Sequence, residues 1–171
     1  MLRGVIIKKL EKFSDERGWL TEIYRQDEAK YQPVMAYVSV TQPGIVRGPH
    51  EHKFQSDFFV FVGPGSFNLY LWDNRKESET FGQKELIEVG ANNPVAVLVP
   101  PGVVHGYKCV SEIPAYSINL PDKLYKGEGK KEEVDEIRWE KDENSLLHLP
   151  DYLHNSSSAD RLTGRLSFQG L

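Results

Sequence analysis

The sequence predicts an all-β protein, folded as a sandwich, jelly roll or barrel. Short runs rich in β-branched and aromatic residues recur between residues 5 and 119, and Gly, Pro, Asn or Asp closes nearly every run. No long segment has clear helical periodicity. Many short strands with turn signals at regular spacing are typical of antiparallel two-layer and closed folds.

The predicted strands follow one another through short connections. The first are residues 5–7 and, after a turn at 15–18, residues 19–24. Residues 58–62 are continuously apolar, which predicts a strand buried on both faces. The best helical candidate, residues 130–136, is mostly charged and fits a solvated loop equally well. The other predicted strands are residues 35–41, 67–72, 86–89, 95–99, 106–110 and 115–119.

Composition limits the class of protein. A length of 171 residues suits one domain with a real core, and a net charge of −4 argues against nucleic-acid or polybasic membrane partners. The single cysteine, Cys109, has no partner for an intramolecular disulfide. Together with the absence of a membrane-length apolar run and of a signal-peptide pattern, this predicts a cytoplasmic protein. We expect a folded domain over residues 1–145 and a polar C-terminal tail over residues 146–171, with disorder as one expectation.

Two histidine-bearing segments are the strongest functional signal. His50 and His52 lie in G-I-V-R-G-P-H-E-H, and His105 lies in P-P-G-V-V-H-G-Y. Histidines at i and i+2 of a strand share one face, and a third joins them if the later strand lies alongside. Inward side chains from strands remote in sequence build the ligand pocket of a small β-barrel.

Five segments resemble, in order, the motifs of the dTDP-4-dehydrorhamnose 3,5-epimerase family. Residues 13–22 (F-S-D-E-R-G-W-L-T-E) resemble its F-x-D-x-R-G-x-F-x-E opening, and residues 44–50 resemble G-V-x-R-G-L-H. Residues 73–82 resemble D-x-R-x-x-S-x-T-F/Y-G, residues 100–107 resemble P-x-G-x-x-H-G-F, and residues 137–139 resemble I-x-W. The resemblance implies a cupin-type jelly-roll β-barrel or sandwich. It also implies a homodimer that exchanges its N-terminal strands.

The resemblance implies an isomerase that needs no cofactor. Such an enzyme epimerises or tautomerises a nucleotide-linked (dTDP) 4-keto-6-deoxy sugar, and polysaccharide or deoxysugar biosynthesis is the implied setting. The family's base maps to His50, and an imidazole with an ordinary pKa near ~6.5 suits that role at neutral pH. Tyr125 is the best match to the tyrosine that returns the proton from the other face of the sugar.

The implied substrate-binding residues come from several segments. Arg17 matches the family's diphosphate-binding arginine, and Glu22 matches a glutamate near the nucleobase. The guanidinium of Arg47 would bind phosphate or a developing enolate. The expected pocket wall is completed by His52, Phe58 and His105.

This sequence also departs from the family pattern. The epimerases carry a lysine that helps to stabilise the enolate, and counting back from Gly65 puts Phe58 at that position. Counting back from Asp73 puts Leu69 at the position of a family aspartate, and Tyr37 stands where the family has asparagine. The late element that supplies an aspartate partner for the base has no clear match. The alternative function is therefore a cupin without epimerase activity that binds a sugar nucleotide or another small ligand.

A three-histidine metal site is the other alternative. His50, His52 and His105 resemble the two halves of the metal-binding cupin motif, and imidazoles are good ligands for zinc, iron or nickel. The usual fourth ligand is a carboxylate, whose position falls on Phe58. Asp57 should face the other way on a regular strand. The sequence therefore predicts that no metal is bound.

Overall fold

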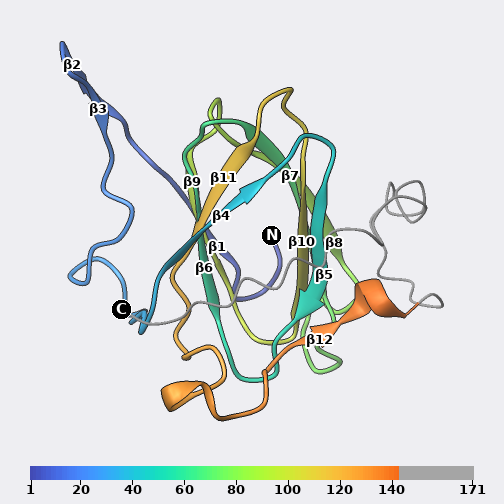
Figure 1. Ribbon diagram of the computed structural model, residues 1–171. Helices are drawn as coiled ribbons and strands as arrows, with labels where there is room; N and C mark the ends of the chain where they lie inside the picture. The colour runs from blue at the N-terminus through green and yellow to red at the C-terminus, as the bar shows by residue number, and fades with distance from the viewer. Residues whose placement is uncertain (143–171) are drawn as a thin grey trace.

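The protein is an antiparallel jelly roll of two facing five-stranded sheets in a computed structural model that describes residues 1–142 (Figure 1). The predicted all-β fold is confirmed, and the strands at residues 95–99 and 115–119 have the predicted bounds. The first sheet has the order β1 (Ile6–Lys9), β9 (Val95–Val99), β6 (Asp57–Phe61), β11 (Ala115–Asn119), β4 (Tyr37–Thr41). The second sheet has the order β12 (Ile137–Arg138), β5 (Val46–Glu51), β10 (Val103–Cys109), β7 (Ser66–Asp73), β8 (Lys84–Gly90).

The N-terminal region differs from the prediction. The expected strand at 19–24 is reduced to β3 (Gly18–Leu20), which pairs only with β2 (Phe13–Asp15). This hairpin projects away from the barrel (Figure 1), because its residues pair with one another and with neither main sheet. Residues 21–31 continue without regular structure, and Ile23 and Tyr24 pack over the outer face of the first sheet.

The charged segment at residues 130–136 forms no regular helix and is mostly a loop, which was one of its two predicted structures. Short 3-10 turns flank it, η1 (Glu128–Lys130) and η2 (Trp139–Lys141). The predicted tail, residues 146–171, and its boundary at 145 lie outside the described residues. Within residues 1–142, no helix has the length and apolar character that crossing a membrane requires.

Alternation along the strands builds the core between the sheets. Phe59 and Phe61 of β6 face Phe67, Leu69 and Tyr107 of the second sheet, and all five are buried. Aromatic rings meet edge to face here, as in the contact between Phe67 and Tyr107 at 5.0 Å between ring centroids. The core therefore fills the space between the two sheets.

One buried carboxylate organises the loop between β7 and β8. Asp73 accepts hydrogen bonds from the Arg75 side chain (Nε and Nη2, both 2.8 Å) and from the hydroxyls of Ser78 and Thr80. Burial alone would raise the pKa of Asp73, but these donors outweigh it and hold the pKa well below the ordinary value. The spacing of the D-x-R-x-x-S-x-T motif is thus explained by the hydrogen bonds that fold this loop around Asp73.

We predict that Asp73→Asn lowers the free energy of unfolding by about 2–4 kcal/mol at pH 7, because buried donors lose a charged acceptor. A carboxylate whose pKa is depressed in the folded state stabilises the protein above its unfolded pKa, near ~3.9. The difference from wild type should therefore shrink as the pH falls below that value. Urea unfolding at pH 7 and pH 3.5 measures the difference in the free energy of unfolding between the variant and the wild type. Glu77→Gln, at an exposed carboxylate of the same loop, is the matched control and should change little. An equal loss for both variants would contradict the assignment.

Candidate functional site

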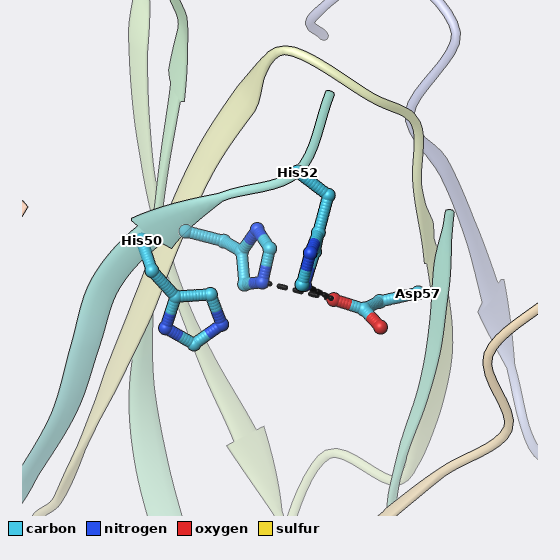
Figure 2. Close-up of side chains that lie close together, drawn as sticks. His50, His52 and Asp57 are labelled. Carbon is cyan, nitrogen blue, oxygen red and sulfur yellow. Dashed lines mark ion pairs between the residues drawn. The ribbon is translucent and has the colours of Figure 1, made fainter. Parts of the chain in front are cut away.

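The three histidines singled out from the sequence converge at the open end of the barrel. The ring centroids of His50 and His105 are 4.4 Å apart, and those of His52 and His105 are 5.9 Å apart. His50 lies on β5, His52 directly follows it, and His105 lies on the neighbouring strand β10. Figure 2 shows His50 and His52 pointing to the same side of the sheet. The predicted convergence is confirmed.

A β-bulge between β5 and β10 sets the direction of these side chains. His105 pairs with His50 and Tyr107 pairs with Arg47, so the single residue Gly106 opposes both Gly48 and Pro49. On a regular strand, residues three apart face opposite sides. The extra residue returns Arg47 to the same side as His50. The bulge also needs glycine, because Gly48 has φ +79° and a Cβ there would lie 2.7 Å from the His105 carbonyl oxygen.

Asp57, at the start of β6, points at the histidines from the facing sheet (Figure 2). Its Oδ2 lies 3.1 Å from His105 Nε2 and 3.2 Å from His52 Nε2. The expectation that Asp57 faces away and Phe58 lines the pocket is wrong. Phe58 packs on the outer face, stacked on Tyr31 with 5.5 Å between ring centroids. Counting back from Gly65 failed because strand parity is not carried across an irregular turn.

The carboxylate of Asp57 is held in a single orientation. Its Oδ1 accepts hydrogen bonds from Gln55 Nε2 (2.9 Å) and Asn119 Nδ2 (2.8 Å), which leaves Oδ2 for the histidines. Burial alone would raise the pKa of Asp57, but the contacts with His105 and His52 outweigh it and place the pKa well below the ordinary value. Asp57 is therefore a buried anion at neutral pH.

Each imidazole has an acceptor beside its Nδ1 atom. His105 Nδ1 donates to the Val103 carbonyl oxygen (3.0 Å), His52 Nδ1 donates to that of Asp135, and His50 Nδ1 lies 3.6 Å from a carboxylate oxygen of Glu136. This arrangement leaves the three Nε2 atoms for the cluster.

The histidines differ in their protonation. Burial, followed by repulsion from His105 and His52, places the pKa of His50 well below the ordinary value, so this imidazole is neutral at pH 7. Burial also acts to lower the pKa of His52, but Asp57 and the Asp135 carbonyl outweigh it and raise the pKa. His50 is consequently neutral and able to accept a proton at pH 7.

Asp135 and Glu136 were missed by sequence reasoning. They lie in the charged segment that the sequence assigned to a solvated loop, yet the carboxylate of Asp135 accepts backbone hydrogen bonds from Lys53 (3.0 Å), Phe54 (2.8 Å) and Gln55 (2.9 Å). Glu136 pairs with His50 from the end of this segment. Only the hydrophobic I-x-W pattern that follows, which anchors β12 and Trp139, gave a signal that the segment returns to the barrel.

Arg47 reaches across the mouth of the barrel between the two sheets. Its Nε donates to the Thr41 hydroxyl (2.9 Å) and its Nη2 donates to the Val40 carbonyl oxygen (2.8 Å), both on β4 of the facing sheet. The bulge places the side chain of Arg47 on the same side of β5 as that of His50. The arginine whose charge acts on the pKa of His50 is Arg138, whose backbone pairs with His50.

Other predicted residues lie farther from the cluster. Arg17 lies at the turn of the projecting β2–β3 hairpin, where it pairs with Asp15. Glu22 is exposed and pairs with Arg25 (3.2 Å). Tyr125 is about half exposed, and its backbone nitrogen contacts Met35 Sδ. The structure brings none of these three side chains into contact with His50.

Tyr37 is a tyrosine near the cluster that the sequence treated only as a departure. Its hydroxyl oxygen accepts a hydrogen bond from Asn119 Nδ2 (2.9 Å), the group that also donates to Asp57. Burial raises the pKa of Tyr37 to about 12, so the phenol carries its proton at neutral pH. Tyr37 is a second candidate for a proton donor.

His50, His52, Asp57 and His105 also form a candidate metal centre. Each offers one ligand atom, and these atoms all lie within 4.8 Å of one another. The sequence argument against a metal depended on Phe58 standing in the carboxylate position. Because Asp57 occupies the inward position instead, that argument no longer holds.

The two-sheet barrel and its polar mouth define a cupin-type jelly roll, and comparison with known proteins identifies the family. Residues 1–161 match the family described as dTDP-4-dehydrorhamnose 3,5-epimerase, and the chain belongs to that family. This membership, with the relatives described below, indicates an epimerase or isomerase of sugar nucleotides.

Two relatives are biosynthetic proteins of surface polysaccharides or glycans. Spore coat polysaccharide biosynthesis protein SpsL of Bacillus subtilis is 37% identical over 115 residues, which cover 67% of this chain and 76% of that protein. The protein named "Probable low-salt glycan biosynthesis epimerase Agl13", of Haloferax volcanii, is 34% identical over 135 residues, 77% of this chain and 86% of that protein.

A solved structure is similar in both sequence and fold. The crystal structure of dTDP-4-dehydrorhamnose 3,5-epimerase from Bacillus anthracis, with TDP and PPi bound, has 27% sequence identity and a TM-score of 0.64. The match covers 71% of this chain and 74% of that one.

We predict that Gly48→Ala destabilises the protein by about 2–4 kcal/mol and shifts the imidazole NMR signals of His50 and His105, because the bulge cannot accept a Cβ. Gly44→Ala is the matched control, since Gly44 also has a positive φ, +76°, but no atom lies within 4 Å of its Cβ position. The control should lose only about 1–2 kcal/mol from backbone strain. Equal losses in urea unfolding, with unchanged imidazole signals, would show that the close approach is unimportant.

Proposed function

We propose that the protein is a nucleotide-sugar isomerase that epimerises or tautomerises a dTDP-linked 4-keto-6-deoxy sugar through a histidine base and a tyrosine acid. The single observation that carries the proposal is His50, a neutral and largely buried imidazole with a carboxylate behind it. Family membership and the TDP-bound relative support the class of substrate.

His50 is proposed to remove the proton from the carbon next to the sugar ketone. With Nδ1 turned to Glu136, its Nε2 is the atom that meets the substrate. Glu136 would orient the ring and stabilise the imidazolium that forms, so it acts as a positioning residue. The short distance from His50 to the other two histidines disfavours a permanent positive charge on His50, which keeps the base available.

The proton is proposed to return to the opposite face of the carbon from a tyrosine. Tyr125 is the residue to which the family resemblance assigns this role. Tyr37 is the candidate that local geometry favours, because its protonated hydroxyl is one hydrogen bond from Asn119 and two from Asp57. Arg47 is proposed to bind the diphosphate at the mouth.

A homodimer is proposed to complete the site. Phe13, Trp19 and Leu20 on the projecting hairpin are each at least half exposed, and an isolated two-stranded hairpin is at best marginally stable in water. Packing this hairpin on a second subunit would bury its apolar side chains. The same movement would carry Arg17 from the hairpin turn toward the partner's pocket, where its guanidinium would bind the nucleotide diphosphate. β1 pairs with β9 of its own chain, so the exchanged part is expected to be β2 and β3.

We predict that the protein exchanges sugar protons next to the ketone when it is incubated with dTDP-4-keto-6-deoxyglucose in deuterated water. His50→Ala should slow this exchange by about 10²–10⁴-fold, because it removes the base. NMR measures the exchange, and calorimetry should show dTDP affinity within a few-fold of wild type. Folded wild-type protein that binds dTDP without any exchange would support a binding protein instead.

Two conservative variants distinguish the candidate acids within the same experiment. Tyr125→Phe and Tyr37→Phe each remove one hydroxyl and keep the ring. The variant that lacks the acid should still lose the substrate proton to solvent but should no longer give the inverted product. If both variants epimerise normally, neither tyrosine is the acid.

We predict a dimer in solution, so light scattering should report about twice the 19.5 kDa chain mass. Trp19→Asp with Leu20→Asp should give a folded monomer with little activity, because the hairpin loses its apolar contact with the partner. Arg17→Ala should keep the dimer and weaken dTDP binding about 10-fold or more. Arg3→Ala, at another exposed arginine, is the control and should bind dTDP normally. A fully active wild-type monomer at micromolar concentration would contradict the composite site.

A further inference from the structure

Three ligand atoms converge on one point at the mouth of the barrel. Asp57 Oδ2 lies 3.1 Å from His105 Nε2 and 3.2 Å from His52 Nε2, and the three side chains come from opposite sheets. Two ligands of a divalent transition metal, each at about 2.0–2.2 Å, are separated by roughly 2.8–3.6 Å at octahedral or tetrahedral angles. The observed separations fall within this range, so one metal ion could bind all three atoms.

The hydrogen bonds around the imidazoles make their Nε2 atoms suitable ligands. Both Nδ1 atoms donate to backbone carbonyls, of Val103 for His105 and of Asp135 for His52. A neutral imidazole that carries its proton on Nδ1 has its lone pair on Nε2. Metal-binding histidines characteristically donate the other ring N–H to a carbonyl or carboxylate, and this fixes the ring toward the metal.

Gln55 holds the two side chains together from one side. Its amide nitrogen donates to Asp57 Oδ1 (2.9 Å) and lies 3.2 Å from His52 Nε2. A metal ion between His52 Nε2 and Asp57 Oδ2, which lie 3.2 Å apart, would take the place of the proton in their direct contact. Gln55 would keep its shorter bond to Asp57.

The same oxygen and nitrogen lack other partners. Apart from the ion-pair contacts, Asp57 Oδ2 and His105 Nε2 are buried without a hydrogen bond to any residue that the structure describes. Both residues are about 1% exposed. The two imidazole contacts compensate the charge of Asp57, and a metal ion held between these atoms would compensate it with a positive charge of its own.

We propose that His52, Asp57 and His105 form a two-histidine, one-carboxylate site for a divalent transition metal ion such as zinc, iron, manganese, cobalt or nickel. His50, whose ligand-capable nitrogen lies within 4.8 Å of the other three ligand atoms, stands beside the ion as the base. The role of the ion rests on the proposed function. When bound, the ion would supply the positive charge that a developing enolate needs, at a site where the inward residue of β6, Asp57, is an acid.

Metal content of the purified, untagged, full-length protein tests the proposal directly. We expect about one ion per chain by mass spectrometry, or after dialysis against each metal in turn. Cobalt(II) loading should give visible d–d absorption bands that zinc abolishes. Asp57→Asn and His105→Gln should each weaken metal affinity about 100-fold or more. Asp27→Asn, at an exposed carboxylate paired with Arg25, is the matched control and should bind as wild type does.

The remaining outcomes separate the roles of the residues. His50→Ala should retain the ion, and its loss to the same extent as in Asp57→Asn would overturn the three-ligand assignment. If a variant folds poorly, the increase in melting temperature of the wild type on adding metal gives the same answer. Wild-type protein that takes up no stoichiometric ion, gives no cobalt bands and shows no metal-induced stabilisation overturns the site. Metal uptake without sugar-proton exchange would preserve the site and remove the epimerase function. Exchange at the wild-type rate in metal-free protein would overturn the proposed role of the ion in the reaction.

Discussion

The contact between Asp57 and two histidines holds the functional end of the barrel together. Asp57 comes from the first sheet, and His52 and His105 come from the second, so these contacts join the two layers. A buried carboxylate is stable only when its surroundings compensate its charge. Gln55, Asn119 and the imidazoles provide that compensation, which explains why so many polar groups lie at one end of an otherwise apolar core.

Other residues hold the histidines and their backbone in position. The bulge at Gly48 and Pro49 turns Arg47 and His50 to one side, and close backbone packing against Gly106 keeps it in place. The carboxylate of Asp135 holds the backbone of residues 53–55, while its carbonyl fixes the ring of His52. Side chains fixed in this way need little reorganisation when a ligand binds, and that favours catalysis as well as binding.

The charge of the residues around His50 bears on how an enzyme of the epimerase family could stabilise an enolate. Counting along the sequence placed Phe58 at the position of the family's lysine, and the residue that faces inward at the start of β6 is the acid Asp57. Because an enolate needs positive charge beside it and Asp57 is an anion, neighbouring groups must supply that positive charge. Arg47, Arg138, whose backbone pairs with His50, and the proposed ion at the histidines are sources of that charge, whereas His50 stays neutral.

Much of the fold and part of the site follow from the sequence alone. Alternation and turn residues predicted the all-β class and most strands, because burial on one face imposes period two on any strand. The motif order predicted the family, and the i, i+2 spacing with the later His105 predicted the histidine cluster. Only the tertiary structure decided which residue of β6 faces inward, because parity is set by packing against the opposite sheet and not by counting through a turn. It alone brought Asp135 and Glu136 to the histidines, since contacts across more than 80 residues leave no local pattern in a charged loop.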